Sequence, residues 1–307
     1  MPDDRPATPV TQESPSSWTT PRRVGVELVE LCRADGHPID ALWYGAEDAR
    51  IGVLHVHGKG SSVLSGPARF LPPLLTGMAH LAVNMRCHDL AYTVGTDDFA
   101  VDGGMWEDLA AGHQDLEAGV AHLRERGVEQ VVVCGHSSGG FYAADLMPRV
   151  EGVAAWVLLS PLTTNRNPFA LWWPDPAEQA RAVGQARALA AAGRGRDLIP
   201  VPGWFHAISA GSLLQRIAEP DGVWLSDLRH AAAPVLMAWG DAEPRHAHWL
   251  EMFAAFAGPS DRQVVLPGAG HYYRGQEPDL AAAVAGFVGE LLCAGENSGE
   301  SAAPSRA

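Results

Sequence analysis

The chain has 307 residues, of which 47% are hydrophobic and 19% are charged, and its formal net charge at pH 7 is -14. This composition excludes an intrinsically disordered chain, and an acidic charge without any basic cluster excludes nucleic acid as the expected partner. Because no apolar run reaches the roughly 18 residues of a membrane helix and the N-terminus has no apolar signal segment, we expect a cytoplasmic protein without membrane contact.

Apolar runs alternate with helical patterns through most of the chain. Residues 1–20 and 294–307 stand outside this alternation, and their composition predicts disordered tails. The apolar runs predict strands over residues 24–31, 39–44, 51–56, 81–84, 131–134, 153–159, 235–239 and 263–266. Helical spacing predicts helices within residues 68–78, 106–123, 141–147 and 279–292. We therefore predict an α/β core formed by residues 21–165 and 231–293, with a mostly parallel sheet and helices on both of its faces.

Residues 166–230 interrupt the alternation, because they hold helical patterns and no convincing strand. Asp175 followed by Pro176 predicts the start of a helix that continues through an alanine-rich stretch, and a second helix is expected near residues 209–217. Ligands of parallel α/β sheets bind beyond the carboxyl ends of the strands. We therefore predict a helical lid insertion that lies over those strand ends.

Large aromatic side chains in the lid and two histidines near the strand ends fit the walls of a ligand pocket. The residues that we expect to line it are His57, His136, Trp172, Trp173 and Trp204. For the tryptophans, packing within the core of the lid itself is the alternative.

A nucleophile motif, Gly135-His136-Ser137-Ser138-Gly139, follows a predicted strand and precedes a predicted helix. A sharp turn in this context lifts the serine hydroxyl out of the sheet. The flanking glycines lack a Cβ atom and so permit close backbone approach. We predict Ser137 as the nucleophile, and a plain strand-to-helix turn is the alternative.

The serine hydroxyl needs a base, and the base needs an acid that orients it. His271 lies in a glycine-rich loop after the last predicted strand, which brings its imidazole to the same edge of the sheet. The loop after residues 235–239 offers two acids, Asp241 and Glu243. Both lie between Ser137 and His271 in the chain, which is the order expected for this arrangement.

A tetrahedral intermediate needs preorganised hydrogen-bond donors. We expect one to be the backbone N–H of Ser138, at the N-terminus of a helix, where free amides and the helix dipole favour an anion. We expect the second to be the N–H of Lys59, with Gly58 as the alternative, and the Lys59 side chain to be solvated. His55 and His57 face the same way at a strand end, but no third ligand is evident, so we expect no metal site.

Taken together, these motifs resemble the α/β-hydrolase superfamily over residues 24–293. The matching segments are His57-Gly58-Lys59-Gly60, Gly135 to Gly139, Gly240 to Glu243, and Gly268-Ala269-Gly270-His271. In that family the acid usually stands three residues after the loop glycine, so the resemblance favours Glu243 over Asp241. Residues 55–89 and the lid also resemble siderophore-esterase-like hydrolases. The resemblance implies the α/β-hydrolase fold, with a helical lid inserted in a mostly parallel sheet.

The same resemblance implies hydrolysis of an ester, thioester, amide or lactone without a cofactor, through an acyl-enzyme on Ser137. Three other functions remain open: an acyltransferase or thioesterase of a biosynthetic pathway, a carbon–carbon bond hydrolase or lyase, and a ligand-binding protein without turnover. The expected partner is a small acyl substrate, and the expected state is a monomer or a homodimer.

Overall fold

A computed structural model gives the three-dimensional structure of most of the chain. The described residues are 24–45, 49–94, 100–109, 111–147, 149–161, 173–202, 207–218, 231, 233–244, 246–255 and 257–299. The tail expected at residues 1–20 lies outside them. Helix α9 (Glu277–Gly299) extends past residue 293, so the first part of the expected C-terminal tail is helical. No proline follows residue 278 until residue 304, so no proline interrupts the helix.

The predicted sheet is present and has eight strands in the order β1-β2-β4-β3-β7-β8-β11-β12. They are β1 (Glu27–Cys32), β2 (Pro38–Tyr44), β3 (Ile51–Val56), β4 (Ala79–Val83), β7 (Gln130–His136), β8 (Val153–Leu159), β11 (Val235–Gly240) and β12 (Arg262–Leu266). Strand β2 pairs antiparallel with both of its neighbours, and all the other pairs are parallel. The prediction of a mostly parallel sheet is confirmed.

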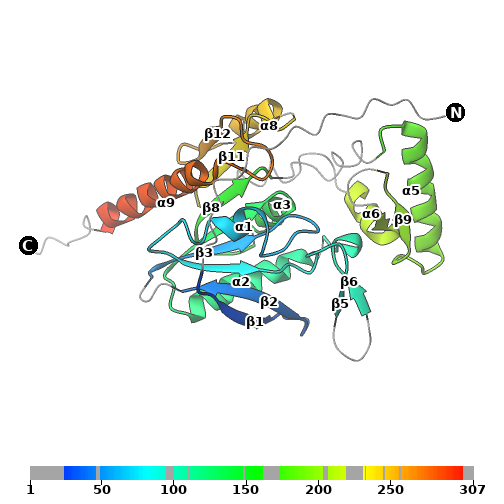
Figure 1. Ribbon diagram of the computed structural model, residues 1–307, viewed down its shortest axis with the longest axis horizontal. Coiled ribbons are helices and arrows are strands. Elements are labelled where there is room, and N and C mark those ends of the chain that lie inside the picture. The colour runs from blue at the N-terminus through cyan, green and yellow to red at the C-terminus, as the bar shows by residue number, and fades with distance from the viewer. Residues whose placement is uncertain are drawn as a thin grey trace, which may run out of the picture.

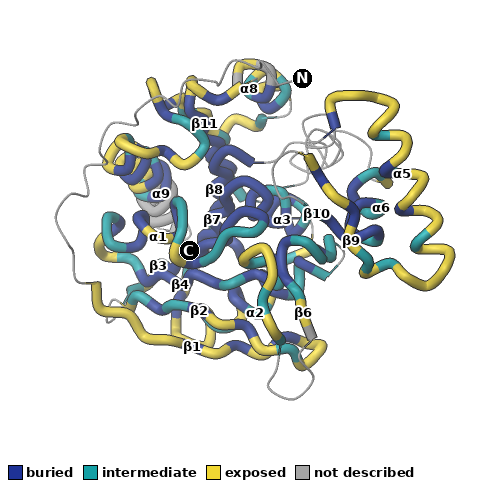
Figure 2. The backbone as a smooth tube through the Cα atoms, turned by 45° about the vertical axis from the view of Figure 1, so that its right-hand side comes forward, coloured by how far each residue is buried: buried dark blue, intermediate teal, exposed yellow. Residues whose placement is uncertain are grey.

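Helices cover both faces of this sheet (Figure 1). They are α1 (Gly66–Phe70), α2 (Gly112–Glu125), α3 (Ser138–Leu146), α8 (His246–Ala254) and α9. Successive residues of a strand point to opposite faces, so Leu54 packs in the cluster under α2, α3 and α8, whereas Val53 packs in the cluster under α1 and α9. Both faces are therefore buried, which is why the central strands read as unbroken apolar runs. Figure 2 shows the central strands as buried along their length.

Two segments differ from the sequence prediction. The helix expected over residues 106–123 begins only at Gly112, and Trp106 belongs to a short 3-10 turn, η1 (Gly104–Trp106). That turn follows a hairpin of β5 (Tyr92–Val94) and β6 (Ala100–Asp102). Helix α1 is only one turn long, because a Pro-Pro pair follows it at residues 72 and 73.

Among the described residues, no helix is both long enough and apolar enough to cross a membrane.

The lid has a small hydrophobic core of its own. It contains α5 (Pro176–Ala191), β9 (Leu198–Pro200), β10 (Ala207–Ser209) and α6 (Ala210–Ala218). The prediction of an insertion without strands is wrong here, since β9 and β10 pair antiparallel over three residues each, too short to give a sequence pattern. Ala186, Ile199 and Leu213 lie at the centre of the lid core. In Figure 1 the lid lies beside the α/β core, on the side away from α9.

Candidate active site

Ser137 lies in a strained turn between β7 and α3. Its backbone φ of 56° and ψ of -120° are rare for a residue with a Cβ atom. The turn is fixed from both sides, because the Ser137 N–H donates to the Leu159 carbonyl at 2.9 Å and the Gly140 N–H donates to the Ser137 carbonyl at 3.0 Å. Such a strained backbone conformation persists only where surrounding contacts hold it in place, and it is common at nucleophilic residues.

Of the two candidate acids, Glu243 is the one that contacts His271. Its Oε2 atom lies 2.8 Å from His271 Nδ1, and its side chain is buried. A proton on Nδ1 leaves a lone pair on Nε2, which is the atom that a general base uses. Nε2 is buried and has no hydrogen-bond partner among the described residues. Asp241 instead accepts from the Gly268 N–H at 2.6 Å and so ties two loops together.

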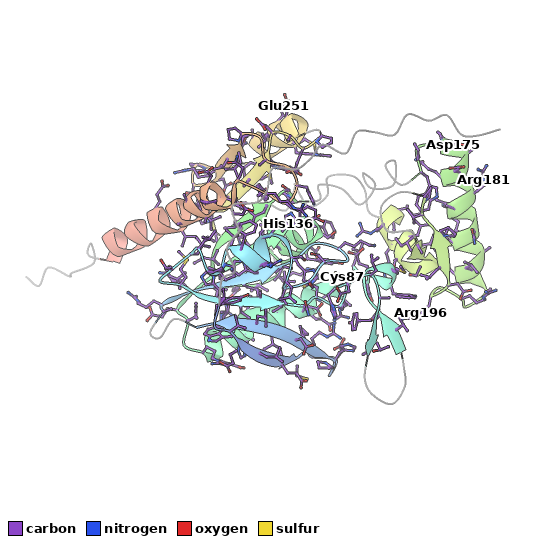
Figure 3. The ribbon with its side chains drawn as sticks, in the orientation of Figure 1. Cys87, His136, Asp175, Arg181, Arg196 and Glu251 are labelled. Atoms are coloured by element: carbon purple, nitrogen blue, oxygen red, sulfur yellow. The ribbon has the colours of Figure 1, made fainter. Side chains whose placement is uncertain are left out.

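His136 holds the loop that carries His271 beside the nucleophile. Its Nε2 atom lies 2.7 Å from the His271 carbonyl oxygen, and the two rings are 4.8 Å apart between centroids. Burial, and then the neighbouring His271, lower the pKa of His136 to about 3, so it is neutral and its Nε2 proton is donated to that carbonyl. Because His136 directly precedes Ser137, this contact brings the two predicted catalytic residues to one edge of the sheet. Figure 3 labels His136.

Two residues that the sequence analysis missed support Glu243. Ser160 follows β8 and donates from its hydroxyl to Glu243 Oε1, which also accepts from the Gly240 N–H at 3.1 Å. The Tyr273 hydroxyl lies 2.7 Å from Ser160 Oγ and donates to the Ala238 carbonyl at 2.9 Å. Both residues have positive φ, 41° for Ser160 and 55° for Tyr273. The only sequence signal was their position, one directly after a strand and the other two residues after His271.

The loop after β3 packs directly against the nucleophile. A Cβ atom on Gly58 would lie 3.0 Å from Ser137 Cβ and 3.4 Å from Ser137 Oγ. His57 fixes this loop, because its Nδ1 lies 2.7 Å from the Gly58 carbonyl and its Nε2 accepts from the Met85 N–H at 2.9 Å. Burial lowers the pKa of His57 to about 4, so the ring is neutral with both nitrogens bonded to the backbone. His57 therefore supports the loop rather than offering a polar atom to a ligand.

The expectation that the Lys59 side chain is solvated is wrong. Its Nζ atom is buried and donates to Glu107 Oε2 at 2.8 Å. Burial lowers the pKa of Lys59 to about 8, although Glu107 opposes that shift. Glu107 follows η1 and was not identified from the sequence, because nothing in its neighbourhood marks it as buried.

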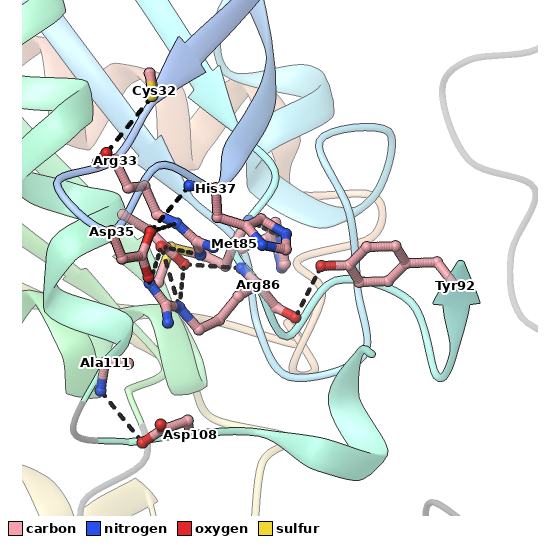
Figure 4. A network of polar contacts seen from close by, with 11 residues as sticks. Cys32, Arg33, Asp35, His37, Met85, Arg86, Tyr92, Asp108 and Ala111 are labelled. Atoms are coloured by element: carbon pink, nitrogen blue, oxygen red, sulfur yellow. Dashed lines mark hydrogen bonds and ion pairs between the residues drawn. The ribbon is translucent and has the colours of Figure 1, made fainter. Parts of the chain in front are cut away.

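The segment after β4, which receives His57, is held by a second ion-pair network (Figure 4). Asp115 on α2 accepts from Arg33 Nη1 at 2.8 Å, from Arg86 Nη2 at 3.0 Å and from the Arg86 backbone N–H at 2.8 Å. Asp115 is fully buried. Met85 precedes Arg86 and its backbone N–H donates to His57. The network therefore stabilises, through Met85 and His57, the loop after β3 that packs against Ser137.

The expected pocket residues are only partly placed. His136 is buried at the turn between β7 and α3, and Trp173 is buried in the core of the lid. Trp172 and Trp204 lie outside the described residues. Within the part of the chain that the structure describes, no cluster of three His, Cys, Asp or Glu side chains fits a metal ion.

Comparisons with known proteins bear on the family and the fold. A family model described as the alpha/beta hydrolase family matches residues 53–284. None of the curated protein sequences matches the chain. Among solved structures, a hypothetical protein from Pseudomonas aeruginosa is similar with a TM-score of 0.67 and 16% identity, over 93% of this chain and 99% of that one.

Two further solved structures are also similar in fold. Est1E from Butyrivibrio proteoclasticus, with bound ferulic acid, has a TM-score of 0.63 and 17% identity, over 86% of this chain and 100% of that one. The Pyrococcus furiosus esterase Pf2001 has a TM-score of 0.56 and 17% identity, over 87% of this chain and 91% of that one. At these identities, the similarity shows the fold alone.

Proposed function

Since the chain belongs to the alpha/beta hydrolase family, we propose that it is a serine hydrolase that cleaves a carboxylic ester through an acyl-enzyme on Ser137. The observation that carries the proposal is the 2.8 Å contact between His271 Nδ1 and Glu243, which leaves Nε2 as a base. The strained turn at Ser137 and the loop that packs against its hydroxyl support the same reading.

In the first half of the reaction, Ser137 Oγ attacks the ester carbonyl carbon and His271 Nε2 takes the hydroxyl proton. Glu243 stabilises the imidazolium through Nδ1, and the N–H groups of Ser138 and Lys59 donate to the oxyanion. The tetrahedral intermediate collapses as His271 gives the proton to the leaving alcohol, and the acyl group stays on Ser137.

In the second half, a water molecule gives a proton to His271 and attacks the acyl carbonyl. Collapse of the second intermediate returns the proton to Ser137 Oγ and releases the carboxylic acid. An alcohol, amine or thiol in place of water makes the same acyl-enzyme a transferase, so chemistry alone does not separate the two functions. The Pyrococcus furiosus esterase among the similar folds supports water and an ester substrate.

Labelling with a fluorophosphonate tests the acyl-enzyme. We expect mass spectrometry to find the adduct on Ser137, and we expect Ser137→Ala to lose both the adduct and turnover of p-nitrophenyl acetate while keeping its circular dichroism. A folded wild-type protein that neither labels nor hydrolyses any ester in a panel of short and aromatic esters would favour a ligand-binding protein. Product that shifts from acid to a new ester when an alcohol is added would favour an acyltransferase.

A further inference from the structure

Glu107 joins three parts of the molecule through one buried carboxylate. Its Oε2 atom accepts from Lys59 Nζ, in the loop after β3, and from Arg216 Nε at 2.9 Å and Arg216 Nη2, on lid helix α6. Its Oε1 atom accepts from the Tyr142 hydroxyl, on the helix that begins after Ser137, at 2.8 Å. The side chains of Glu107, Lys59 and Arg216 are each exposed by 2% or less. Although burial raises the pKa of Glu107, Arg216 and Lys59 lower it to about 2, so the carboxylate stays charged.

The segment that carries Glu107 also contacts the loop after β3 through its backbone. A Cβ atom on Gly104 would lie 2.9 Å from the Cα atom of Gly60, so the two chains approach with no room for a side chain. The Gly60 N–H donates to the Cys87 carbonyl at 3.0 Å, and the Gly104 N–H donates to the Asp89 carbonyl at 2.8 Å. Residues 103–107 therefore pack directly against the loop that holds Lys59.

The lid packs on the same segment at separate places. Close to Glu107, Ser212 Oγ donates to the Glu107 carbonyl at 2.7 Å, and the Leu109 N–H donates to Gln215 Oε1 at 2.9 Å. Further out, Arg196 donates to the Val101 carbonyl and lies 5.6 Å from the centroid of the Trp106 ring. Arg216 and Arg196 thus hold the lid to one segment, Arg216 through a buried charge and Arg196 at the surface. Arg196 is labelled in Figure 3.

We propose that Glu107 is a positioning residue that links the seating of the lid to the geometry of the oxyanion hole. The inference rests on the proposed function, because it takes the Lys59 N–H as an oxyanion donor. With α6 in place, Arg216 holds the Glu107 carboxylate where it fixes the Lys59 side chain and hence its backbone. When α6 moves away, Glu107 loses its two-pronged partner and water reaches the pair, so the loop loosens. The site is then complete only when the lid is seated.

Three variants test this link, each of which removes one cation. Arg216→Met cuts the connection from the lid and leaves the Lys59–Glu107 pair intact. Lys59→Met cuts the connection to the loop and leaves the Arg216–Glu107 pair intact. Arg196→Met is the matched control, because it removes the same charge from the same lid at a surface contact. Arg216→Lys, which keeps the charge without the planar fork, replaces Arg216→Met if that variant does not fold.

The first measurement is hydrogen exchange of the Gly60 and Ser61 amides, which does not depend on turnover. We expect at least about tenfold faster exchange in Arg216→Met and Lys59→Met and wild-type exchange in Arg196→Met. The second measurement is inhibition by a trifluoromethyl ketone, which forms a tetrahedral adduct with the nucleophile. We expect inhibition and kcat/KM for p-nitrophenyl acetate to weaken by the same factor, about 10-fold in Arg216→Met and about 100-fold in Lys59→Met, with KM little changed.

Two results would overturn the link. One is unchanged hydrogen exchange of these amides in Arg216→Met. The other is an equal increase in their exchange rate in Arg216→Met and Arg196→Met, which would mean that loosening the lid at either contact has the same effect on the loop. A merely structural role of Glu107 predicts a change in KM or stability without the matched loss of inhibitor affinity. If the wild-type protein neither labels nor turns over, the proposed function fails while the exchange data still decide whether the lid and the loop are linked.

Discussion

Glu107 and Glu243 are two buried carboxylates near the same edge of the sheet, and their surroundings differ. Glu107 accepts from two cations and a phenol hydroxyl, contributed by the lid, the loop after β3 and α3. Glu243 accepts from a hydroxyl, a backbone amide and an imidazole, all from the α/β core. A carboxylate whose partners are already charged is held at a fixed state, whereas one among neutral donors can stabilise a charge that appears later. The second arrangement suits an acid that must respond to an imidazolium.

The largest expected effect comes from Glu243→Gln. An amide at this position presents an N–H donor or a weaker acceptor to His271 Nδ1, so the imidazolium loses its counter-charge and the favoured tautomer is lost. We expect kcat for p-nitrophenyl acetate to fall by about 10⁴-fold. The matched control is Asp241→Asn, two residues away on the same loop, for which we expect a change of less than about threefold. The opposite ranking would make Asp241 the acid.

Glu107→Gln tests whether the charged surroundings of Glu107 stabilise the fold more than the neutral surroundings of Glu243 do. It leaves Lys59 and Arg216 buried without their shared carboxylate, and a buried charge without its partner costs about 3–5 kcal/mol. Glu243→Gln still accepts from Ser160 and Gly240, so we expect it to cost only about 1–2 kcal/mol. Urea unfolding of both variants measures the two costs. A larger loss in Glu243→Gln than in Glu107→Gln would show that the neutral surroundings, not the charged ones, anchor the fold.

The two glutamates also mark how far the sequence alone could go. Glu243 and Asp241 were both candidates because they follow a clear strand in the chain order expected of the acid, and the family resemblance favoured Glu243. Glu107 was missed because its partners lie 48 and 109 residues away, and no local pattern records such distant contacts. The central strands, in contrast, could be predicted, because their burial on both faces of the sheet appears in the sequence as a continuous apolar run. The strands β9 and β10 have only three residues each, which is too short for such a run.

Ser160→Ala tests whether the neutral donors position the acid. The change removes one donor from Glu243 Oε1 and leaves the Gly240 N–H in place. A hydrogen bond to a charged group is worth about 1.5–3 kcal/mol. We expect about 1.4 kcal/mol of this to appear as a tenfold loss in kcat. The double variant Ser160→Ala/Glu243→Gln is the control, because a donor that acts through Glu243 adds nothing once the acid is gone. Independent, multiplying losses in the two changes would contradict a positioning role for Ser160.

The smallest expected effects separate two buried tyrosines, one beside each glutamate. Tyr142→Phe removes the phenol donor from the charged Glu107 Oε1, so we expect a loss of about 2 kcal/mol in the free energy of unfolding. Tyr273→Phe removes a donor only from neutral groups, and the Ala238 carbonyl still accepts from the Ser160 N–H at 2.8 Å. We expect that variant to lose about 1 kcal/mol. Urea unfolding under one set of conditions compares the pair, whose phenol groups are both fully buried. Equal losses would mean that the cations around Glu107 already satisfy its carboxylate, and that the charge of the acceptor does not distinguish the two regions.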